Sequence, residues 1–343
     1  MQGISSSTES PAAALAEEDG RVQARIAVVI PCFKVKKQIL QVLAAIGPEC
    51  EAVYVVDDAC PEGTADLVAS ECTDRRVRVL RHERNRGVGS ATMTGYRAAI
   101  DGGSDVIVKL DGDGQMDPSL IPRLVRPILD GEADYTKGNR FFEPDGLRDM
   151  PRIRLLGNAL LSFASKLSSG YWHLFDPTNG FTALHAAVAA ALPLEKISRR
   201  WFFESDLLFR LGTLRAVVVD VPMAAVYATE NSSLVIHRLL FEFSWKHVAN
   251  TVKRILYGYY LRDFNIASLE ILFGVAFLVF GTWVGVTEWW SVARSGVVAS
   301  SGTVMLAALP VMIGVQLVLA FFTFDMHNVP RDSIHRKLTP DLD

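Results

Sequence analysis

The sequence has little that would place it among nucleic-acid-binding, disulfide-stabilised or repetitive proteins. Its 343 residues carry 35 lysines and arginines against 38 aspartates and glutamates, so a net charge of −3 leaves no basic surplus for nucleic acid. The four cysteines form no Cys-x-x-Cys pair and have no histidines at zinc spacing, which favours single thiols in a reducing compartment. No period of about 20 to 50 residues recurs, which excludes a repeat array.

The first residues also lack the features of a signal peptide. Residues 1–24 are rich in serine, alanine and glutamate, and no basic segment precedes an apolar one. This composition predicts a disordered tail, and the domain that follows is expected to stay in the cytosol.

Two long apolar runs near the C-terminus raise the mean hydropathy to +0.21. Residues 271–287 and 295–324 contain no charged side chain, and each run can supply about 20 helical residues, enough to cross about 30 Å of hydrocarbon. We therefore expect a two-helix transmembrane hairpin over residues 264–326, with a linker at 288–302 and a cytoplasmic tail at 327–343. The alternative is a pair of buried helices in a soluble protein.

Basic residues flank the predicted hairpin and are scarce in its linker, where only Arg294 is basic. The positive-inside rule then puts both termini and the large domain on the cytoplasmic side of an inner or plasma membrane. The flanking residues are Lys246, Lys253, Arg254, Arg262, Arg331, Arg336 and Lys337. Before the hairpin, residues 233–263 alternate apolar and basic positions at helical spacing, which predicts interfacial amphipathic helices. An ordinary surface helix is the alternative.

Residues 25–232 show alternating strand and helix patterns. Continuous apolar runs at 25–30, 53–56, 77–80 and 106–110 predict strands, the first of them ended by Pro31. Helical patterns at 38–46, 65–71 and 89–100 separate these strands. Strands that are apolar on both faces indicate an α/β domain, a mostly parallel sheet with covering helices, whose ligands bind at the carboxyl ends of the strands.

Acidic residues follow two of these strands. Asp57 and Asp58 end one, and Asp111-Gly112-Asp113 with Gln115 follows another. Carboxylate and amide oxygens are suitable ligands for Mg²⁺ or Mn²⁺, which usually bridge to substrate phosphates. The segment from Asn85 to Gly89 resembles a glycine-rich phosphate-binding turn, although such a segment alone is more often a simple loop.

The motifs taken in order resemble those of family-2 glycosyltransferases with the GT-A fold. The resemblance covers about residues 25–231 and is strongest to the branch of dolichol-phosphate mannosyltransferases and bacterial polyprenyl-phosphate glycosyltransferases. The matching segments are Ile30-Pro31, Val56-Asp57-Asp58 with Gly63-Thr64, Asn85-x-Gly87-x-Gly89, Asp111-x-Asp113-x-Gln115, Gly138-Asn139-Arg140-Phe141, Asp176 to Phe181 and Glu204-Ser205-Asp206.

The resemblance implies roles for individual residues. Donor binding would involve Pro31, Cys32, Asp57, Asp58, Asn85, Gly87 and Asp111. The metal ion, Mg²⁺ or Mn²⁺, would be held by Asp113, Gln115 and Asp111. The acceptor phosphate would meet Arg140, Arg154, Asn158, Thr178 and Asn179. The catalytic group would comprise Asp111, Asp176, Glu204 and Asp206. Two departures stand out: Asn139 replaces a serine common in the branch, and Glu204 and Asp206 are spaced differently from the usual Glu-Asp pair.

The implied enzyme is a membrane-anchored inverting glycosyltransferase with a UDP- or GDP-linked sugar donor and a polyprenyl phosphate acceptor. Since a phosphate monoester is already nucleophilic near neutral pH, charge neutralisation by arginine matters more than a general base. An alternative enzyme would extend a lipid-linked or cell-surface glycan at a sugar hydroxyl, with Glu204 or Asp206 as base. The sequence leaves open which sugar is transferred, which nucleotide base the donor carries and whether the chain forms a homo-oligomer.

Overall fold

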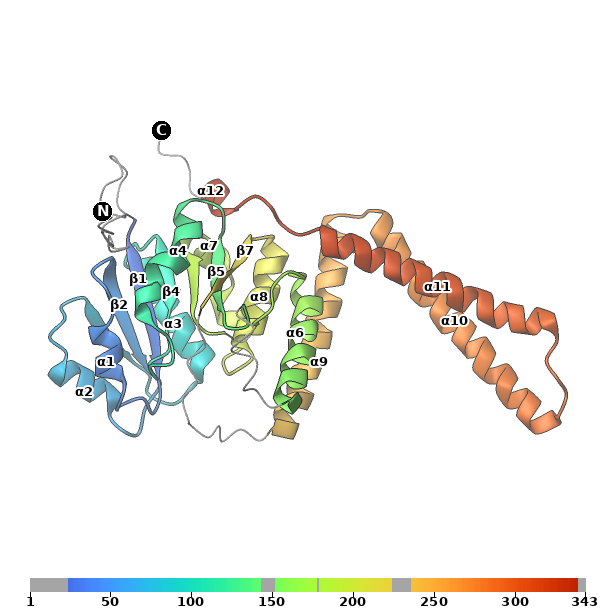
Figure 1. Ribbon diagram of the computed structural model, residues 1–343, viewed down its shortest axis with the longest axis horizontal. Helices are drawn as coiled ribbons and strands as arrows, with labels where there is room; N and C mark the ends of the chain where they lie inside the picture. Colours follow the sequence, from blue (N-terminus) through green and yellow to red (C-terminus); the bar gives the residue numbers. More distant parts are fainter. Residues whose placement is uncertain (1–23, 143–151, 178, 224–235, 339–343) are drawn as a thin grey trace, which may run out of the picture.

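The computed structural model describes residues 24–142, 152–177, 179–223 and 236–338, without the side chains of residues 152–156 and 236–240. The N-terminal tail expected at 1–24 therefore lies almost entirely outside the described residues, as does Thr178. An α/β domain occupies one end of the molecule, and two long helices project from it (Figure 1).

One seven-stranded sheet, ordered β3-β2-β1-β4-β6-β5-β7, forms the centre of the α/β domain. All strand pairs are parallel except those of β6, which runs antiparallel to β4 and β5, so the prediction of a mostly parallel sheet is confirmed. The strands are β1 (Ile26–Cys32), β2 (Cys50–Asp57), β3 (Val77–Arg81), β4 (Val106–Lys109), β5 (Tyr135–Asn139), β6 (Thr182–His185) and β7 (Val218–Pro222).

Helices cover both faces of the sheet, as its two-sided apolar strands require. One face packs against α1, α2 and α4, and the other against α3, α7 and α8. Their bounds are α1 (Ile39–Ala44), α2 (Thr64–Glu71), α3 (Val88–Asp101), α4 (Ile121–Leu129), α7 (Ala186–Ala191) and α8 (Phe203–Leu214), with short 3-10 turns η1 (Pro118–Leu120) and η2 (Leu194–Lys196).

The prediction that Pro31 ends the first strand is wrong, because β1 continues through Cys32. Pro31 pairs with Val56 of β2, whereas the pairing with β4 on the other side ends at Val29. At Pro31 the strand therefore has a neighbour on one side only. Proline, which lacks an N–H, is tolerated where no second ladder needs a donor.

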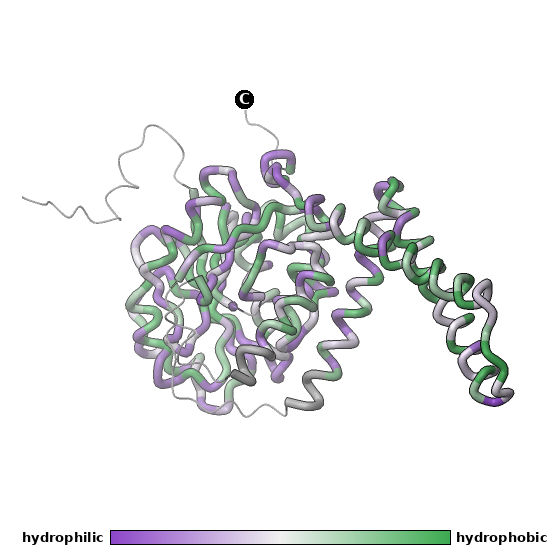
Figure 2. The backbone as a smooth tube through the Cα atoms, turned by 45° about the vertical axis from the view of Figure 1, so that its right-hand side comes forward, coloured by the Kyte–Doolittle hydropathy of each residue, from purple (hydrophilic) through white to green (hydrophobic). Residues whose placement is uncertain are grey.

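Two helices are long and apolar enough to cross a membrane: α10 (Ile266–Ser295) and α11 (Ser301–His327). Most of their apolar surface is unburied, unlike that of core helices in a soluble protein, and Figure 2 shows them as a hydrophobic arm. The linker expected at 288–302 is shorter than predicted, because α10 continues to Ser295 and only Gly296–Ser300 connect the two helices.

Before the arm, α9 (Ile236–Leu256) is one continuous helix that ends in a π-helical turn, Tyr257–Arg262. It runs beside α6 (Arg152–Ser169) at the edge of the α/β domain (Figure 1). Its exposed side chains include Phe241, Trp245, Val248 and Val252. An exposed apolar stripe next to two candidate membrane spans is what an interfacial helix requires.

Polar contacts fasten the arm to the domain. Asp325, near the end of α11, accepts hydrogen bonds from both terminal nitrogens of Arg254 on α9. The chain then returns to the domain, where α12 (His335–Leu338) begins at the buried carboxylate of Asp134. His335 also stacks on His185. Part of the segment expected to be the cytoplasmic tail is thus packed on the sheet domain.

Candidate active site

A buried lysine organises the carboxylates at the carboxyl end of β4. Lys109 is 2% exposed, and its Nζ lies 2.7 Å from Asp111 Oδ1 and 3.6 Å from Glu204 Oε1. Burial alone would lower the pKa of Lys109, but the two carboxylates outweigh burial and raise it. The ammonium is therefore held charged between the two acids, although sequence reasoning gave Lys109 no role.

The two carboxylates of this cluster have different surroundings. The side chain of Asp111 is 31% exposed, whereas that of Glu204 is 17% exposed. Burial raises the pKa of Glu204 to about 7, with Lys109 opposing the shift and Asp111 adding to it. A carboxyl group that titrates near neutral pH inside a cluster of charges is typical of functional sites.

Gly180 closes the cluster from the side of β6. A Cβ atom at this position would collide with Lys109 Nζ and would lie 2.9 Å from Asp111 Oδ2 and 3.0 Å from Glu204 Oε1. Only glycine at position 180 allows the side chains of Lys109, Asp111 and Glu204 to keep these positions. This contact supplies a physical reason for a glycine in the Asp176-to-Phe181 segment.

Asp113 and Gln115 lie just beyond Asp111. Asp113 Oδ1 accepts a hydrogen bond from the backbone N–H of Gln115, and Gly114 between them has a φ of +76°, which glycine adopts without strain. Asp113 remains partly exposed. Within the described residues no group of three or more His, Cys, Asp or Glu side chains could hold a metal ion.

The acids that end β2 have backbone partners. Asp57 Oδ1 accepts from the N–H of Cys60, and Asp58 accepts from the N–H groups of Arg86 and Gly87. Asp58 Oδ1 also lies 2.7 Å from His82 Nδ1, so Asp58 holds the loop that follows β3. Its predicted role in donor binding stays a prediction.

Two other residues predicted to bind the donor lie at the same edge of the sheet. Pro31 and Cys32 pair with Val56 and Asp57, which places them beside the acids of β2. The Cys32 thiol is buried, and burial raises its pKa far above its ordinary value, so any contact with a donor involves its backbone rather than a thiolate.

Arg140, which follows β5, forms a bidentate ion pair with Asp176. Its Nε lies 2.8 Å from Oδ2 and its terminal nitrogen 3.0 Å from Oδ1 of the buried carboxylate. Asn139 is braced in turn by Asp220, which also accepts from Lys137. The Arg140 side chain is nevertheless 34% exposed, so it can present guanidinium N–H groups to an anion.

The other residues predicted to meet the acceptor phosphate are only partly described by the structure. Arg154 and Asn158 both lie on α6, one turn apart, but the Arg154 side chain is outside the described residues. Asn179 is buried and accepts from the N–H of Phe181, while Thr178 is outside the described residues.

The structure separates Glu204 from Asp206, although both lie in the first turn of α8. Asp206 accepts from the N–H of Ser198 and from Asn250 on α9, and it pairs with Arg210. It does not join Glu204 in the Lys109 cluster. No sequence motif signalled Lys109 or His82, because an isolated lysine in a strand and a lone histidine carry no spacing pattern.

The sequence matches a family of known proteins. The profile described as "Glycosyl transferase family 2" matches residues 27–192. An undecaprenyl-phosphate mannosyltransferase of Micrococcus luteus is 30% identical over 207 residues, 59% of this chain and 84% of that protein. The chain belongs to glycosyl transferase family 2.

Another family member similar to this chain is the UDP-N-acetylglucosamine–dolichyl-phosphate N-acetylglucosaminyltransferase of Methanococcus voltae. It is 26% identical over 216 residues, which cover 59% of this chain and 86% of that protein. The prediction of a family-2 glycosyltransferase is therefore confirmed.

The fold agrees with a solved glycosyltransferase of the GT-A type. Glucosyl-3-phosphoglycerate synthase of Mycobacterium tuberculosis, solved with Mn²⁺, uridine-diphosphate-glucose and phosphoglyceric acid, has a TM-score of 0.52 at 21% identity, covering 71% of this chain and 81% of that one. The same enzyme with Mg²⁺ and uridine-diphosphate also gives 0.52, at 20% identity, covering 69% and 84%. At these identities the likeness shows the fold, as predicted.

Proposed function

We propose that this chain is a membrane-anchored, inverting glycosyltransferase that moves a sugar from a nucleotide-diphosphate sugar to polyprenyl phosphate. The observation that carries the proposal is a family-2 site on a domain whose edge helix, α9, leads directly into two apolar helices. The relatives named for undecaprenyl phosphate and dolichyl phosphate support the same acceptor. An isoprenoid lipid must be met at a bilayer surface, which such an arm would provide.

The proposed location is an inner or plasma membrane, crossed twice, with the catalytic domain on the cytoplasmic side. Basic residues precede α10 and follow α11 in the chain, which supports this orientation. The connection between the two helices, Gly296–Ser300, contains no basic residue. The interfacial position of α9 would bring the carboxyl edge of the sheet close to the lipid headgroups.

The residues at the end of β4 fit a divalent cation bound together with a substrate. We assign Asp113 and Gln115 to Mg²⁺ or Mn²⁺, with Asp111, which Lys109 contacts, beside them. Such a sparse set suits magnesium, which keeps several waters and takes other ligands from substrate phosphates. When bound, the cation would neutralise the departing nucleoside diphosphate.

The acceptor phosphate would be received by guanidinium groups. Arg140 is oriented by the bidentate pair with Asp176, which removes most of its rotamer freedom before an anion arrives. Arg154 and Asn158 of α6 are proposed as its partners on the sequence resemblance. The phosphate oxygen would attack the sugar C1 in a single displacement, and the configuration at C1 would invert.

In this reaction the Lys109 cluster would face the donor sugar rather than act as a base. Lys109 keeps Asp111 turned toward the same space as Glu204, where paired oxygens can accept from sugar hydroxyls. A glycan-extending enzyme is the second candidate, and the Glu204 pKa of about 7 favours it, since a hydroxyl acceptor needs a base that titrates near the working pH.

The acceptor decides between the two. Membranes from cells that produce the chain would be incubated with labelled nucleotide sugars and added polyprenyl phosphate, and the lipid extract would be compared with that from an Asp113→Ala strain. We expect a label in a glycosyl phosphoryl lipid that depends on the added acceptor. A label found only on pre-existing glycan would reject the lipid-phosphate acceptor and support the second candidate.

A further inference from the structure

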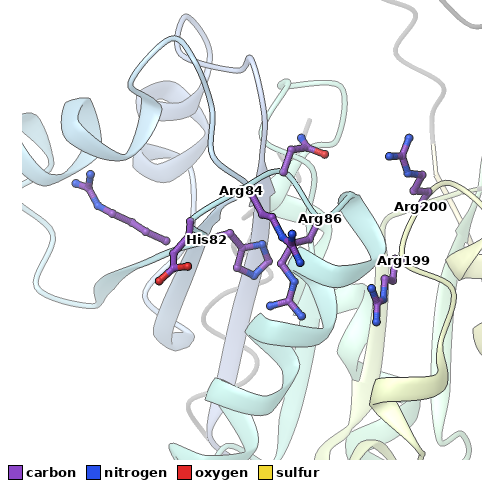
Figure 3. Close-up of a pocket in the computed structure, with 8 residues that line it drawn as sticks. His82, Arg84, Arg86, Arg199 and Arg200 are labelled. Atoms are coloured by element: carbon purple, nitrogen blue, oxygen red, sulfur yellow. The ribbon is translucent and has the colours of Figure 1, made fainter.

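A strongly basic pocket lies outside the cluster of Lys109. We call it the arginine pocket: a cavity of about 700 Å³ between the segment that follows β3 and the segment that precedes α8. Figure 3 shows Arg84 and Arg86 on the first segment and Arg199 and Arg200 across from them on the second. Its lining residues are Arg81, His82, Glu83, Arg84, Asn85, Arg86, Arg199 and Arg200.

The two segments are fixed against each other by their backbones. The N–H of Ser90 donates to the carbonyl of Arg199 at 3.1 Å. A Cβ at Gly87 or Gly89 would collide with the carbonyls of Arg199 or Ser198. The two glycines of the Asn85-x-Gly87-x-Gly89 motif therefore permit this close approach, which places four arginines around one pocket.

The segment that follows β3 is also held by side chains at the end of β2 and on α3. Asp58 accepts from the N–H groups of Arg86 and Gly87 and contacts His82 Nδ1, while His82 Nε2 lies 3.0 Å from Thr94 Oγ1 of α3. With these N–H groups engaged, the start of α3 offers fewer backbone donors than a phosphate-binding turn would. Any anion here would be bound chiefly by arginine side chains.

Most arginines of the arginine pocket have no acid at ion-pair distance within the described residues. In the described parts of the chain, Arg84, Arg86, Arg199 and Arg200 form no ion pair, whereas Arg81 pairs with Asp66. Glu83 is the one acid among the lining residues. Gathering like charges is unfavourable unless an anion offsets them, and this clustering occurs in a protein whose net charge is −3.

We propose that the arginine pocket is a binding site for a phosphate-bearing anion, either a free phosphate compound or a lipid headgroup. Guanidinium groups bind phosphate oxygens with two parallel hydrogen bonds, and four of them on opposite walls can engage a diphosphate from both sides. The volume exceeds what a single phosphate needs. This site goes beyond the proposed glycosyl transfer, because that reaction uses none of the four arginines, although Asn85, which also lines the pocket, is among the residues expected to bind the donor.

Binding of inorganic pyrophosphate without divalent cations tests the site separately from a metal-dependent one. The full chain in phosphatidylcholine nanodiscs with EDTA would be titrated by calorimetry, alongside R84Q/R200Q and the matched control R123Q/R126Q on α4. Both double variants remove two exposed positive charges. We expect R84Q/R200Q to weaken binding at least about tenfold, because two guanidinium groups that donate charge-assisted hydrogen bonds to the anion are lost.

The control should bind within about twofold of the original chain, and Asp113→Ala should bind equally well. No pyrophosphate binding by the original chain, or equal weakening by the two double variants, would overturn the proposal. Citrate binding as tight as that of pyrophosphate would also overturn it, since the site would then not select phosphate. Circular dichroism would verify that both variants are folded.

A second arm identifies the source of the phosphate. The titration would be repeated in nanodiscs that contain phosphatidic acid. If a lipid headgroup occupies the pocket, phosphatidic acid should weaken pyrophosphate binding by the original chain about tenfold, by competition. Unchanged pyrophosphate binding would assign the site to a soluble phosphate compound; both results support a phosphate site.

Discussion

Two regions of this molecule that contain buried charges differ in the surroundings of those charges. At the junction of the apolar arm, the Asp325 carboxylate accepts from both terminal nitrogens of Arg254, from the Tyr259 hydroxyl and from Trp172 Nε1. At the end of β4, Asp111 and Glu204 share one ammonium, that of Lys109, and Asp111 is partly exposed.

The difference separates a structural ion pair from a site prepared for a ligand. A carboxylate with all its oxygens satisfied gains nothing from a substrate, so Asp325 serves to fix α11 against α9. Two acids that share one cation keep hydrogen-bonding capacity for incoming hydroxyl groups. We expect substitutions in the first region to change stability and those in the second to change turnover.

Asp113→Ala should have the largest effect. Removing the carboxylate that we assign to the cation should lower transfer by at least about 10³-fold and abolish metal-dependent nucleotide binding. The control Asp117→Ala removes an acid four residues away whose carboxylate accepts from the N–H of Ser119. Calorimetry with a nucleoside diphosphate and Mn²⁺ measures the binding. Full metal-dependent binding by Asp113→Ala would remove the metal assignment.

Asp325→Asn should affect stability most. The substitution leaves the buried Arg254 guanidinium without its counter-charge, which should cost about 3 kcal/mol in the free energy of unfolding. Urea unfolding of the full chain in detergent, followed by tryptophan fluorescence, measures the loss. Asp263→Asn, at an exposed position before α10, should change it by less than about 0.5 kcal/mol. Equal stability of the two variants would show that the junction is not structural.

Lys109→Met should lower kcat about 100-fold, since Asp111 and Glu204 would lose the cation that fixes their positions. Lys137→Met is the matched control, because Lys137 is also a buried lysine in a strand. Its Nζ lies 3.1 Å from Asp220 Oδ1, outside the Lys109 cluster. Both variants should lose stability, but only the first should lose turnover at a temperature where both are folded. Parallel losses of kcat would mean that Lys109 is merely structural.

Glu204→Gln should remove a pH dependence of stability. The folded-state pKa of Glu204, about 7, is above its ordinary value of 4.5, so ionisation disfavours the folded state. The protonated Glu204 therefore stabilises the folded state fully below its ordinary pKa of 4.5. This stabilisation is lost as the pH rises through the folded-state pKa of about 7. Between about pH 5 and pH 7 the original chain should lose about 2 kcal/mol more than Glu204→Gln.

The exposed substitution Glu195→Gln should leave that loss unchanged. Unfolding free energies measured at several pH values for the three proteins decide the matter, and identical pH dependence of all three would show that Glu204 is ionised at an ordinary pKa.

Much of the fold could be predicted from the sequence because its strands are short, continuous apolar runs. Two-sided burial in a parallel sheet produces such runs directly, and the apolar arm follows from length and charge alone. The end of β1 could not be predicted, because whether Pro31 stops a strand depends on which neighbour is present. The extension of α10 through Trp289 and Ser295 depends on helix propensity in a polar segment.

The candidate site could be predicted only where its chemistry follows a local spacing. Asp111, Asp113 and Gln115 belong to one motif, whereas Lys109 and Glu204 meet through the packing of α8 beside β4. The different surroundings of Glu204 and Asp206 also depend on tertiary contacts, since both stand in the same helical turn. The roles of Gly87 and Gly89 became apparent only with the carbonyls they approach.

Phosphorus NMR of the acceptor tests the central claim most directly. Purified chain in nanodiscs would be mixed with polyprenyl phosphate, Mg²⁺ and a panel of nucleotide sugars, with Asp113→Ala as the blank. We expect one donor to convert the phosphomonoester signal of the lipid into a phosphodiester signal, in step with release of nucleoside diphosphate. Nucleoside diphosphate release with the lipid signal still that of a monoester would contradict it.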